Sequence, residues 1–227
     1  MGITGMVYVV TMVFLLIVLI LSSSTMGHDY FQFTQQYQLA VCNSNRAPCK
    51  DPPDKLFTVH GLWPSSMVGP DPSNCSIRNI RKREKLLEPQ LAIIWPNVFD
   101  RTKNKLFWDK EWMKHGTCGY PTIDNENHYF ETVIKMYISK KQNVSGILSK
   151  AKIEPDGKKR ALLDIENAIR KGADNKKPKL KCQKKGTMTE LVEITLCSDK
   201  SGEHFIDCPH PFEPISPHYC PTNNIKY

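Results

Sequence analysis

FTVHGLWP at residues 57–64 and WDKEWMKHGTCG at residues 108–119 are the two stretches of this 227-residue chain that say most about its fold and its chemistry. The first begins with the apolar alternation of a strand, and the second repeats its functional side chains at helical spacing. Each stretch contains one histidine, His60 and His115. Because an imidazole titrates near neutral pH, two histidines can act together as a general acid and a general base.

The second stretch predicts one broad helix face that carries an anion, a cation and a proton carrier. Trp108, Glu111 and His115 recur at helical spacing, and Lys114 follows Glu111 by three residues. Opposite His60, such a set suits phosphoryl transfer, in which protons move at two oxygens while negative charge increases between them. This chemistry needs no metal ion and no organic cofactor.

A structural explanation of the same residues is also open. His60 beside Trp63 can be a hydrogen-bonded core histidine, and Glu111 with His115 can be a pair on a helix surface. Trp, Glu, Lys and His side chains are nevertheless unusually concentrated in the second stretch for a plain amphipathic helix. The two stretches together therefore favour catalysis.

Both stretches resemble the two active-site segments of the secreted acid ribonucleases of the T2 type. QLAVC at residues 38–42, IIWPNVFDR at residues 93–101 and the eight cysteines are similar to the plant S-ribonucleases, the pistil proteins of self-incompatibility. The resemblance covers the chain after its first 27 residues. It implies an α+β fold in a single domain, with a central antiparallel sheet flanked by helices and the active site on the face of the sheet.

The resemblance also implies a reaction, the cleavage of single-stranded RNA to a 2′,3′-cyclic phosphate. His115 would take the 2′-proton, His60 would protonate the leaving 5′-oxygen, and Lys114 and Glu111 would stabilise the phosphorane. Many family members carry a further histidine directly before this glutamate, whereas this chain has Lys110. A lysine shuttles protons poorly near neutral pH but still contacts phosphate, and the same departure is common among S-ribonucleases.

A substrate cleft is implied in the same way. Its residues would be Gln36, Trp63, Val98, Phe99, Arg101, Phe107 and Lys110. Aromatic faces are the usual means of gripping single-stranded RNA. For Phe99, Phe107 and Trp63, ordinary core packing is the alternative.

The first 27 residues predict a secretory signal peptide that is removed from a ribonuclease domain at residues 28–227. Residues 6–21 are apolar with Thr11 as the only polar interruption, and the small polar stretch SSSTMG follows. A membrane anchor that stays uncleaved is the alternative, although the apolar run is slightly short for a bilayer. We therefore expect a secreted, extracellular protein without a membrane anchor, in the extracellular matrix of the style if it is an S-ribonuclease.

The eight cysteines predict four disulfides, because their number is even, they form no CxxC pair and the predicted compartment is oxidising. Spacing alone leaves about 105 pairings open. The resemblance implies Cys42 with Cys49, Cys75 with Cys118, Cys182 with Cys220, and Cys197 with Cys208. The alternative is a zinc site, either at His115 and Cys118 or at Cys208 and His210. We expect no metal.

Glycosylation is predicted at two sequons, which begin at Asn74 and Asn143. The net charge of +8 lies entirely after residue 27, and much of it falls between Lys150 and Lys185. Such a field favours polyanions such as RNA, although a lysine-rich surface can also serve solubility alone. About 200 mature residues without a flexible linker favour one domain, and we expect a monomer.

Periodicity predicts where the main elements lie. Strands are expected over residues 31–41, where Leu39 and Val41 continue the alternation, and in parts of residues 57–60 and 192–197. Apolar stripes predict two core-facing helices, one at Phe130, Val133, Ile134, Tyr137 and Ile138, and one at Leu162, Ile165 and Ile169 that runs from near Asp156 to Gly172. Residues 65–88 are polar and charged and predict exposed surface; the resemblance implies a variable patch there that contacts pollen recognition proteins.

Three functions are consistent with these features. The first is a cytotoxic pistil S-ribonuclease in gametophytic self-incompatibility. The second is a general secreted ribonuclease for defence or phosphate scavenging, and the third is a non-catalytic basic glycoprotein that binds polyanions. His60, Glu111, Lys114 and His115 all occur together, which favours an enzyme over the third function.

Overall fold

The computed structural model describes residues 27–44, 48–139 and 142–227. The predicted signal peptide falls almost entirely outside these ranges and stays a prediction. Within them, no helix is long and apolar enough to cross a bilayer.

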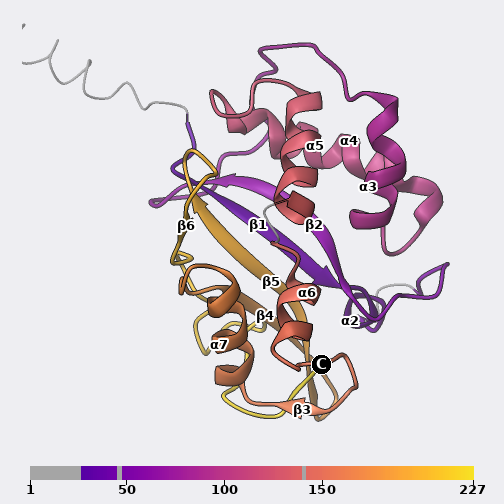
Figure 1. Ribbon diagram of the computed structural model, residues 1–227, viewed down its shortest axis with the longest axis vertical. Coiled ribbons are helices and arrows are strands. Elements are labelled where there is room, and N and C mark those ends of the chain that lie inside the picture. The colour runs from indigo at the N-terminus through magenta and orange to yellow at the C-terminus, as the bar shows by residue number, and fades with distance from the viewer. Residues whose placement is uncertain (1–26, 45–47, 140–141) are drawn as a thin grey trace, which may run out of the picture.

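A central sheet organises the described part of the chain (Figure 1). Its main path is β2 (Phe57–Ser65), β1 (Tyr30–Tyr37), β5 (Met188–Asp199), β7 (Ile225–Lys226) and β3 (Lys159–Arg160), and β4 (Lys179–Lys185) and β6 (Phe205–Ile206) also pair with β5. The long strands are antiparallel, whereas β5 and β7 pair in parallel. The fold is α+β, as expected, but the predicted antiparallel sheet is a mixed one.

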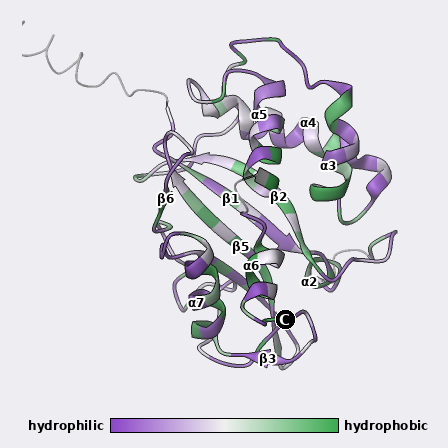
Figure 2. Cartoon of the chain, viewed as in Figure 1, coloured by the Kyte–Doolittle hydropathy of each residue, from purple (hydrophilic) through white to green (hydrophobic). Residues whose placement is uncertain are grey.

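The helices form two groups against this sheet (Figure 1). The first group is α3 (Glu88–Ile94), α4 (Asn104–Lys114) and α5 (Glu126–Ile134), and the second is α6 (Val144–Lys150) and α7 (Leu162–Gly172). Each group packs on its own hydrophobic cluster. One cluster joins α3–α5 to β1 and β2 around Trp95 and Phe130, and the other joins α6 and α7 to β4, β5 and β7 around Leu148 and Ile194. In Figure 2, hydrophobic residues accordingly recur along β5 where it passes under α6.

Two predicted elements have different boundaries in the structure. β1 ends at Tyr37, and Leu39 and Val41 belong to the short helix α2 (Gln38–Cys42). A short apolar alternation is compatible with either kind of element, so periodicity alone placed the end of the strand wrongly. α7 begins at Leu162 rather than near Asp156, because the Asp156 side chain accepts a hydrogen bond from the Lys158 N–H in a turn that the left-handed Gly157 continues.

Two further predictions, the helical stripe at residues 130–138 and the exposed surface at residues 65–88, are confirmed in part. Within the second range, Ser65 and Leu87 are buried. The apolar stripe over residues 130–138 forms α5 and the π-helical turn η4 (Lys135–Ser139), but Ile138 is exposed rather than buried. Residues 66–82 are mostly exposed, as predicted. The Arg83 side chain, in contrast, is only 7% exposed, with ion pairs to Glu126 and Asp109 and its guanidinium over the Phe130 ring.

The eight cysteines form four disulfides, and none of them is left free. They join Cys42 to Cys49, Cys75 to Cys118, Cys182 to Cys220 and Cys197 to Cys208, the same pairs that the resemblance implies. Because Cys118 and Cys208 are both bridged, neither offers a thiolate to zinc, and the two alternative zinc sites lose their sulfur ligands.

Candidate active site

His60 lies at a bulge in β2. Val59 and Gly61 each have a partner residue on β1, whereas the pairing skips His60. A bulge bends a strand and redirects the side chain that it carries. The His60 carbonyl accepts a 2.9 Å hydrogen bond from the Trp95 indole, which ties the bulged backbone to the core. The imidazole itself is 30% exposed.

His115 lies where α4 ends. The helix finishes at Lys114, and the His115 N–H still donates to the Glu111 carbonyl at 3.0 Å. The chain then enters the 3-10 turn η3 (Gly116–Gly119). A Cβ at Gly116 would overlap the Trp112 ring, so glycine is needed for this close approach. The helix end therefore presents His115 partly exposed, immediately before a tightly packed turn.

Trp63 brings the two histidines together. Its ring centroid lies 5.1 Å from that of His60 and 5.4 Å from that of His115. Both imidazoles therefore contact one indole, although they come from different elements of the fold. The disulfide between Cys75 and Cys118 joins the loop after β2 to η3, next to His115.

Glu111 contacts the same indole from α4. The Trp63 Nε1–H donates a 3.0 Å hydrogen bond to the Glu111 carboxylate. Burial raises the pKa of Glu111, and the charge of His60 and the Trp63 hydrogen bond only partly oppose this effect. Gly61 makes room for the arrangement, because a Cβ there would overlap the Trp63 indole nitrogen and lie 2.6 Å from the Glu111 carboxylate.

The predicted helix face is divided between core and cleft. Trp108 is buried and donates its indole N–H to the Trp95 carbonyl at 2.7 Å, so it supports the core and not the cleft. Lys114 is exposed at the end of α4, and its positive charge acts on both Glu111 and His115. Lys110 is exposed one turn earlier.

The pKa values of the two histidines are shifted in opposite directions. Burial, together with the positive charges of Lys114 and His60, lowers the pKa of His115 to about 4. Burial also opposes the charged form of His60, but a hydrogen bond and a negative charge from Glu193 outweigh it and raise the pKa of His60. A pair of titratable groups separated in this way is suited to act as base and acid.

Glu193 is the functional residue that sequence reasoning missed. It lies on β5, and its Oε1 is 2.9 Å from the Nδ1 of His60. Its other carboxylate oxygen pairs with Lys181 on β4 at 3.2 Å. A signal was present in the sequence, because this glutamate lies among apolar residues of the strand predicted within residues 192–197, and buried carboxylates are rare unless they are paired.

Phe107 and Phe99, two of the aromatic residues predicted to bind substrate, differ in their contact with His60. Phe107 is half-buried and stacks at 6.5 Å on His60, so it lies at the cleft. Phe99 is 38% exposed, beyond the end of α3. Both rings therefore offer some surface, but only Phe107 has a ring contact with a catalytic candidate among the described residues.

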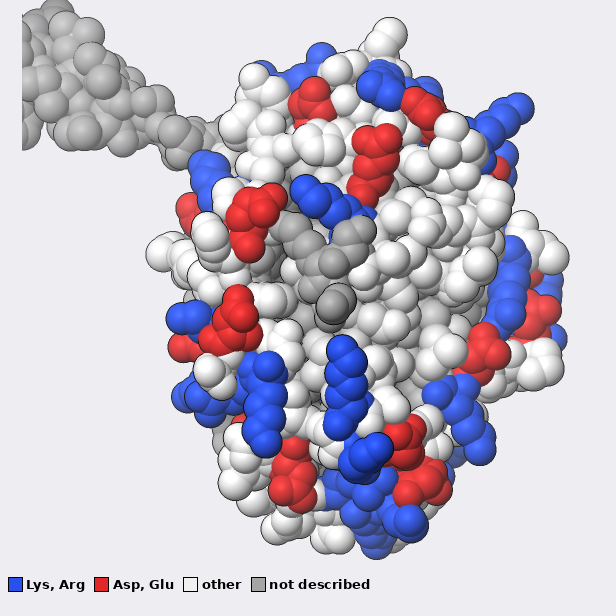
Figure 3. Space-filling view, in the orientation of Figure 1, with Lys and Arg blue, Asp and Glu red and all other residues white. Residues whose placement is uncertain are grey.

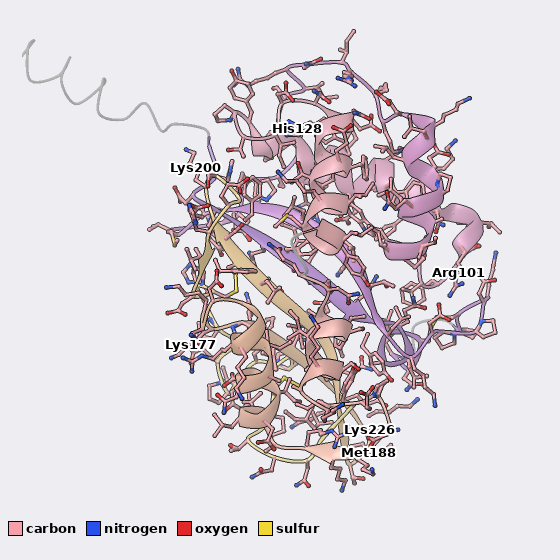
Figure 4. All side chains as sticks on the ribbon, in the orientation of Figure 1. Arg101, His128, Lys177, Met188, Lys200 and Lys226 are labelled. Atoms are coloured by element: carbon pink, nitrogen blue, oxygen red, sulfur yellow. A yellow bond between two sulfur atoms is a disulfide. The ribbon has the colours of Figure 1, made fainter. Side chains whose placement is uncertain are left out.

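The other substrate-binding predictions have mixed outcomes. Gln36 is 6% exposed and pairs with Glu193 across β1 and β5, so the two side chains share one face of the sheet. Val98 is 5% exposed and belongs to the core, which contradicts its predicted place along the cleft. Arg101 is bound to Asp54 at 2.8 Å and lies at the edge of the molecule beside the loop before β2 (Figure 4). Its guanidinium is thus held by that loop.

The surface carries the other predicted features. Asn74 is exposed, while the Asn143 side chain caps α6 by accepting a hydrogen bond from the Gly146 N–H at 3.3 Å. In Figure 3, Lys and Arg side chains gather over the lower part of the face, where α6, α7 and β3 lie in Figure 1, with acidic side chains among them.

Comparison with known proteins places this geometry in a family. Residues 28–208 match the profile of the Ribonuclease T2 family. The chain is 96% identical to Ribonuclease S-5 of Pyrus pyrifolia over the full length of both proteins, and 92% identical to Ribonuclease S-3 of the same species over 98% of this chain and all of the relative.

Solved structures agree with the sequence comparison. The crystal structure of Japanese pear S3-RNase superposes with a TM-score of 0.87 at 93% identity and covers 88% of this chain and 100% of its own. Ribonuclease MC1 from the seeds of bitter gourd reaches a TM-score of 0.72 at 29% identity, covering 87% of this chain and 99% of its own. The chain therefore belongs to the Ribonuclease T2 family.

Proposed function

We propose that this ribonuclease is a secreted, metal-independent endoribonuclease that cleaves single-stranded RNA by transphosphorylation and acts as a cytotoxic pistil S-ribonuclease in gametophytic self-incompatibility. One observation carries the chemistry: two imidazoles with oppositely shifted pKa values contact the same indole, that of Trp63. The similarity to the Pyrus S-ribonucleases supports the biological role.

The reaction begins at the 2′-hydroxyl of RNA. His115 removes its proton, which it can do because a pKa lowered to about 4 keeps the imidazole neutral at all but the most acidic working pH. The oxygen then attacks the adjacent phosphorus. DNA lacks this internal nucleophile and is not a substrate.

His60 completes the reaction at the opposite oxygen. Its raised pKa keeps the imidazole protonated, and it gives that proton to the departing 5′-oxygen. The P–O bond to the 5′-oxygen breaks as the bond to the 2′-oxygen forms, and the product is a 2′,3′-cyclic phosphate.

Lys114 and Glu111 act on the negative charge that develops between the two proton transfers. The exposed ammonium of Lys114 stabilises the phosphorane oxygens directly. Glu111, held by the Trp63 indole, orients the neighbouring groups and hydrogen-bonds the phosphoryl oxygens when it is protonated.

Phe107 is the substrate-binding residue that the geometry favours, because Gln36 is only 6% exposed. The Phe107 ring, stacked beside His60, offers a face for a base or a ribose, while Gln36 lies on the same sheet face as Glu193. Phe99, Arg101 and Lys110 are exposed and would contact the flanking nucleotides. The net charge of +8 attracts the polyanion as a whole.

The biological role adds a location and a partner. We place the protein in the extracellular matrix of the style as a monomer, after removal of residues 1–27 and with glycans on Asn74 and Asn143. Pollen recognition proteins would contact the exposed surface at residues 66–82. A general defence or phosphate-scavenging ribonuclease would need no such partner.

Substitution of the histidines tests the chemistry. His60→Asn and His115→Asn are each expected to lower kcat/KM on single-stranded RNA by about 10²- to 10⁴-fold, the usual contribution of one acid or base. His128→Asn is the matched control, because His128 is exposed on α5 and its imidazole bonds only Asp124 among the described residues. Full activity in either cleft variant at an unchanged melting temperature would overturn the proposal.

Pistils that express the protein test the biological role. An S-ribonuclease is expected in the style alone, and a pistil that carries the active protein is expected to reject pollen of the matching type, whereas the His115→Asn form accepts it. Expression throughout the plant, or rejection by the inactive form, would favour one of the other functions.

A further inference from the structure

Glu193 lies between a catalytic candidate and a lysine, and each of its carboxylate oxygens has its own partner. Oε1 is 2.9 Å from Nδ1 of His60, and Oε2 is 3.2 Å from Nζ of Lys181. The three side chains come from β2, β5 and β4 and are each less than one third exposed. This contact is therefore set by strand positions in the sheet and not by mobile surface groups.

The ionisation of Glu193 decides which His60 nitrogen carries a hydrogen. Burial favours the neutral acid, but the hydrogen bonds and charges of His60 and Lys181 outweigh it and lower the pKa of Glu193 to about 2. An ionised carboxylate only accepts hydrogen bonds, so the hydrogen between the two residues belongs to Nδ1 of His60. Nε2 is then the nitrogen left for exchange with the substrate.

We propose that Glu193 is a positioning residue for the leaving-group proton: it holds the His60 ring with Nδ1 protonated and favours its cationic form, while Lys181 fixes Glu193 and moderates this effect. The inference rests on the proposed role of His60 as the acid. Glu193 touches neither the substrate nor the reacting atoms, and it acts only through His60.

Titratable groups on four segments surround His60, and three of them act on its charge. Glu193 on β5 and Glu111 on α4 favour the imidazolium, whereas Lys181 on β4 disfavours it. His115 after α4 has a pKa of about 4 and is neutral where His60 titrates. The charge of Glu193 also acts on Lys179 and His218, where it favours the protonated forms. Of the two carboxylates that favour the imidazolium, Glu193 is the one that is also hydrogen-bonded to the His60 ring. Its removal should therefore lower the pKa of His60 more than removal of Glu111.

Two substitutions test the inference because they should shift the same limb of the pH profile in opposite directions. Glu193→Gln keeps the shape but removes the charge, so the alkaline limb of kcat/KM on a dinucleotide should move to lower pH by about one unit or more. The maximum value of kcat/KM should fall about 10- to 100-fold, the loss seen when the carboxylate that orients a metal-binding histidine is removed. Lys181→Met should move the alkaline limb to higher pH.

Glu190→Gln is the matched control. Glu190 is buried on the same strand, and its carboxylate bonds Asn43 and Gln183 away from His60. Its substitution removes an equally buried carboxylate and should leave the pH profile in place. An alkaline limb that stays in place in Glu193→Gln would overturn the inference.

A measurement on the unsubstituted protein covers the case in which Glu193→Gln does not fold. Histidine ¹⁵N NMR above the pKa of His60 should show hydrogen on Nδ1, and hydrogen on Nε2 would overturn the inference. This outcome is separate from the proposed function. If His60→Asn is inactive while the NMR shows hydrogen on Nε2, the acid role stands and only the positioning role fails; if His60→Asn is active, both fail.

Discussion

The indole N–H of Trp63 donates a 3.0 Å hydrogen bond to the Glu111 carboxylate, and this contact joins β2 to the end of α4. It crosses between the two segments that carry His60 and His115. The same indole contacts both imidazoles. Trp63 therefore sets the spacing of the site as well as the position of its carboxylate.

Trp63→Phe keeps an aromatic ring between the histidines and removes the indole donor. Glu111 then loses a hydrogen bond to its ionised form, so its pKa should rise further. We expect kcat to fall about tenfold, in proportion to a lost hydrogen bond to a charged group, and the free energy of unfolding to fall by about 1–3 kcal/mol. Steady-state kinetics and urea unfolding measure the two effects. Unchanged kcat would show that the contact is only structural.

Gly61→Ala should damage the site through a single methyl group. Its Cβ would overlap the Trp63 indole nitrogen, so Trp63 and Glu111 must move apart. A displacement of about 1 Å at a catalytic constellation can cost about 100-fold in rate, and we expect a loss of this order in kcat/KM.

Gly146→Ala is the control for this substitution. Gly146 lies in α6, and the nearest atom to an added Cβ is 3.9 Å away in Asn143. We expect unchanged activity and up to about 1 kcal/mol of added stability, because alanine favours a helix over glycine. Equal activity of both alanine variants would contradict the role of Gly61.

The pH dependence of kcat/KM should be bell-shaped, with the optimum on the acidic side of neutral or near it. Activity needs neutral His115 and cationic His60. It therefore rises as the pH passes the His115 pKa of about 4, and it falls as the pH passes the raised pKa of His60. A single ascending limb without an alkaline decline would contradict the acid role of His60. Dinucleotide kinetics across the range measure both limbs.

The disulfide between Cys75 and Cys118 should contribute more stability than the one between Cys42 and Cys49. The two bridges span 43 and 7 residues, and the chain-entropy relation assigns them about 4 and about 2 kcal/mol. Paired Cys→Ser variants compared by denaturant unfolding test this order. We also expect only the first pair to lower activity, because only that bridge adjoins His115. A larger loss of stability from removing the Cys42–Cys49 bridge would contradict the chain-entropy relation for this protein.

Local sequence patterns were sufficient for much of the fold. β2, β5, α5 and α7 follow from alternation or from helical stripes, because burial of one face imposes those periods on the sequence. The segments around His60 and His115 were found from their concentration of functional side chains and from the family resemblance. The failures lie where a short pattern is ambiguous, as in α2, or where tertiary contacts bury a charge, as at Arg83.

Glu193 shows why part of the site could not be predicted. Its contact with His60 depends on the pairing of β1 with both β2 and β5, which joins residues far apart in the chain. Periodicity describes neighbours within one element and carries no register between distant strands. The glutamate within an apolar strand was visible in the sequence, but its partner was not.

The roles of His60 and His115 are tested most directly with a nucleoside 3′-phosphate ester of 4-nitrophenol. This leaving group departs as a stable anion and needs no proton, so the substrate bypasses the acid and still requires the base. We expect His60→Asn to cleave this ester at close to the unsubstituted rate while it fails on RNA, and His115→Asn to fail on both. Rescue of His115→Asn instead would reverse the two roles, and equal failure of both variants on the ester would contradict the assignment of His60 as the acid.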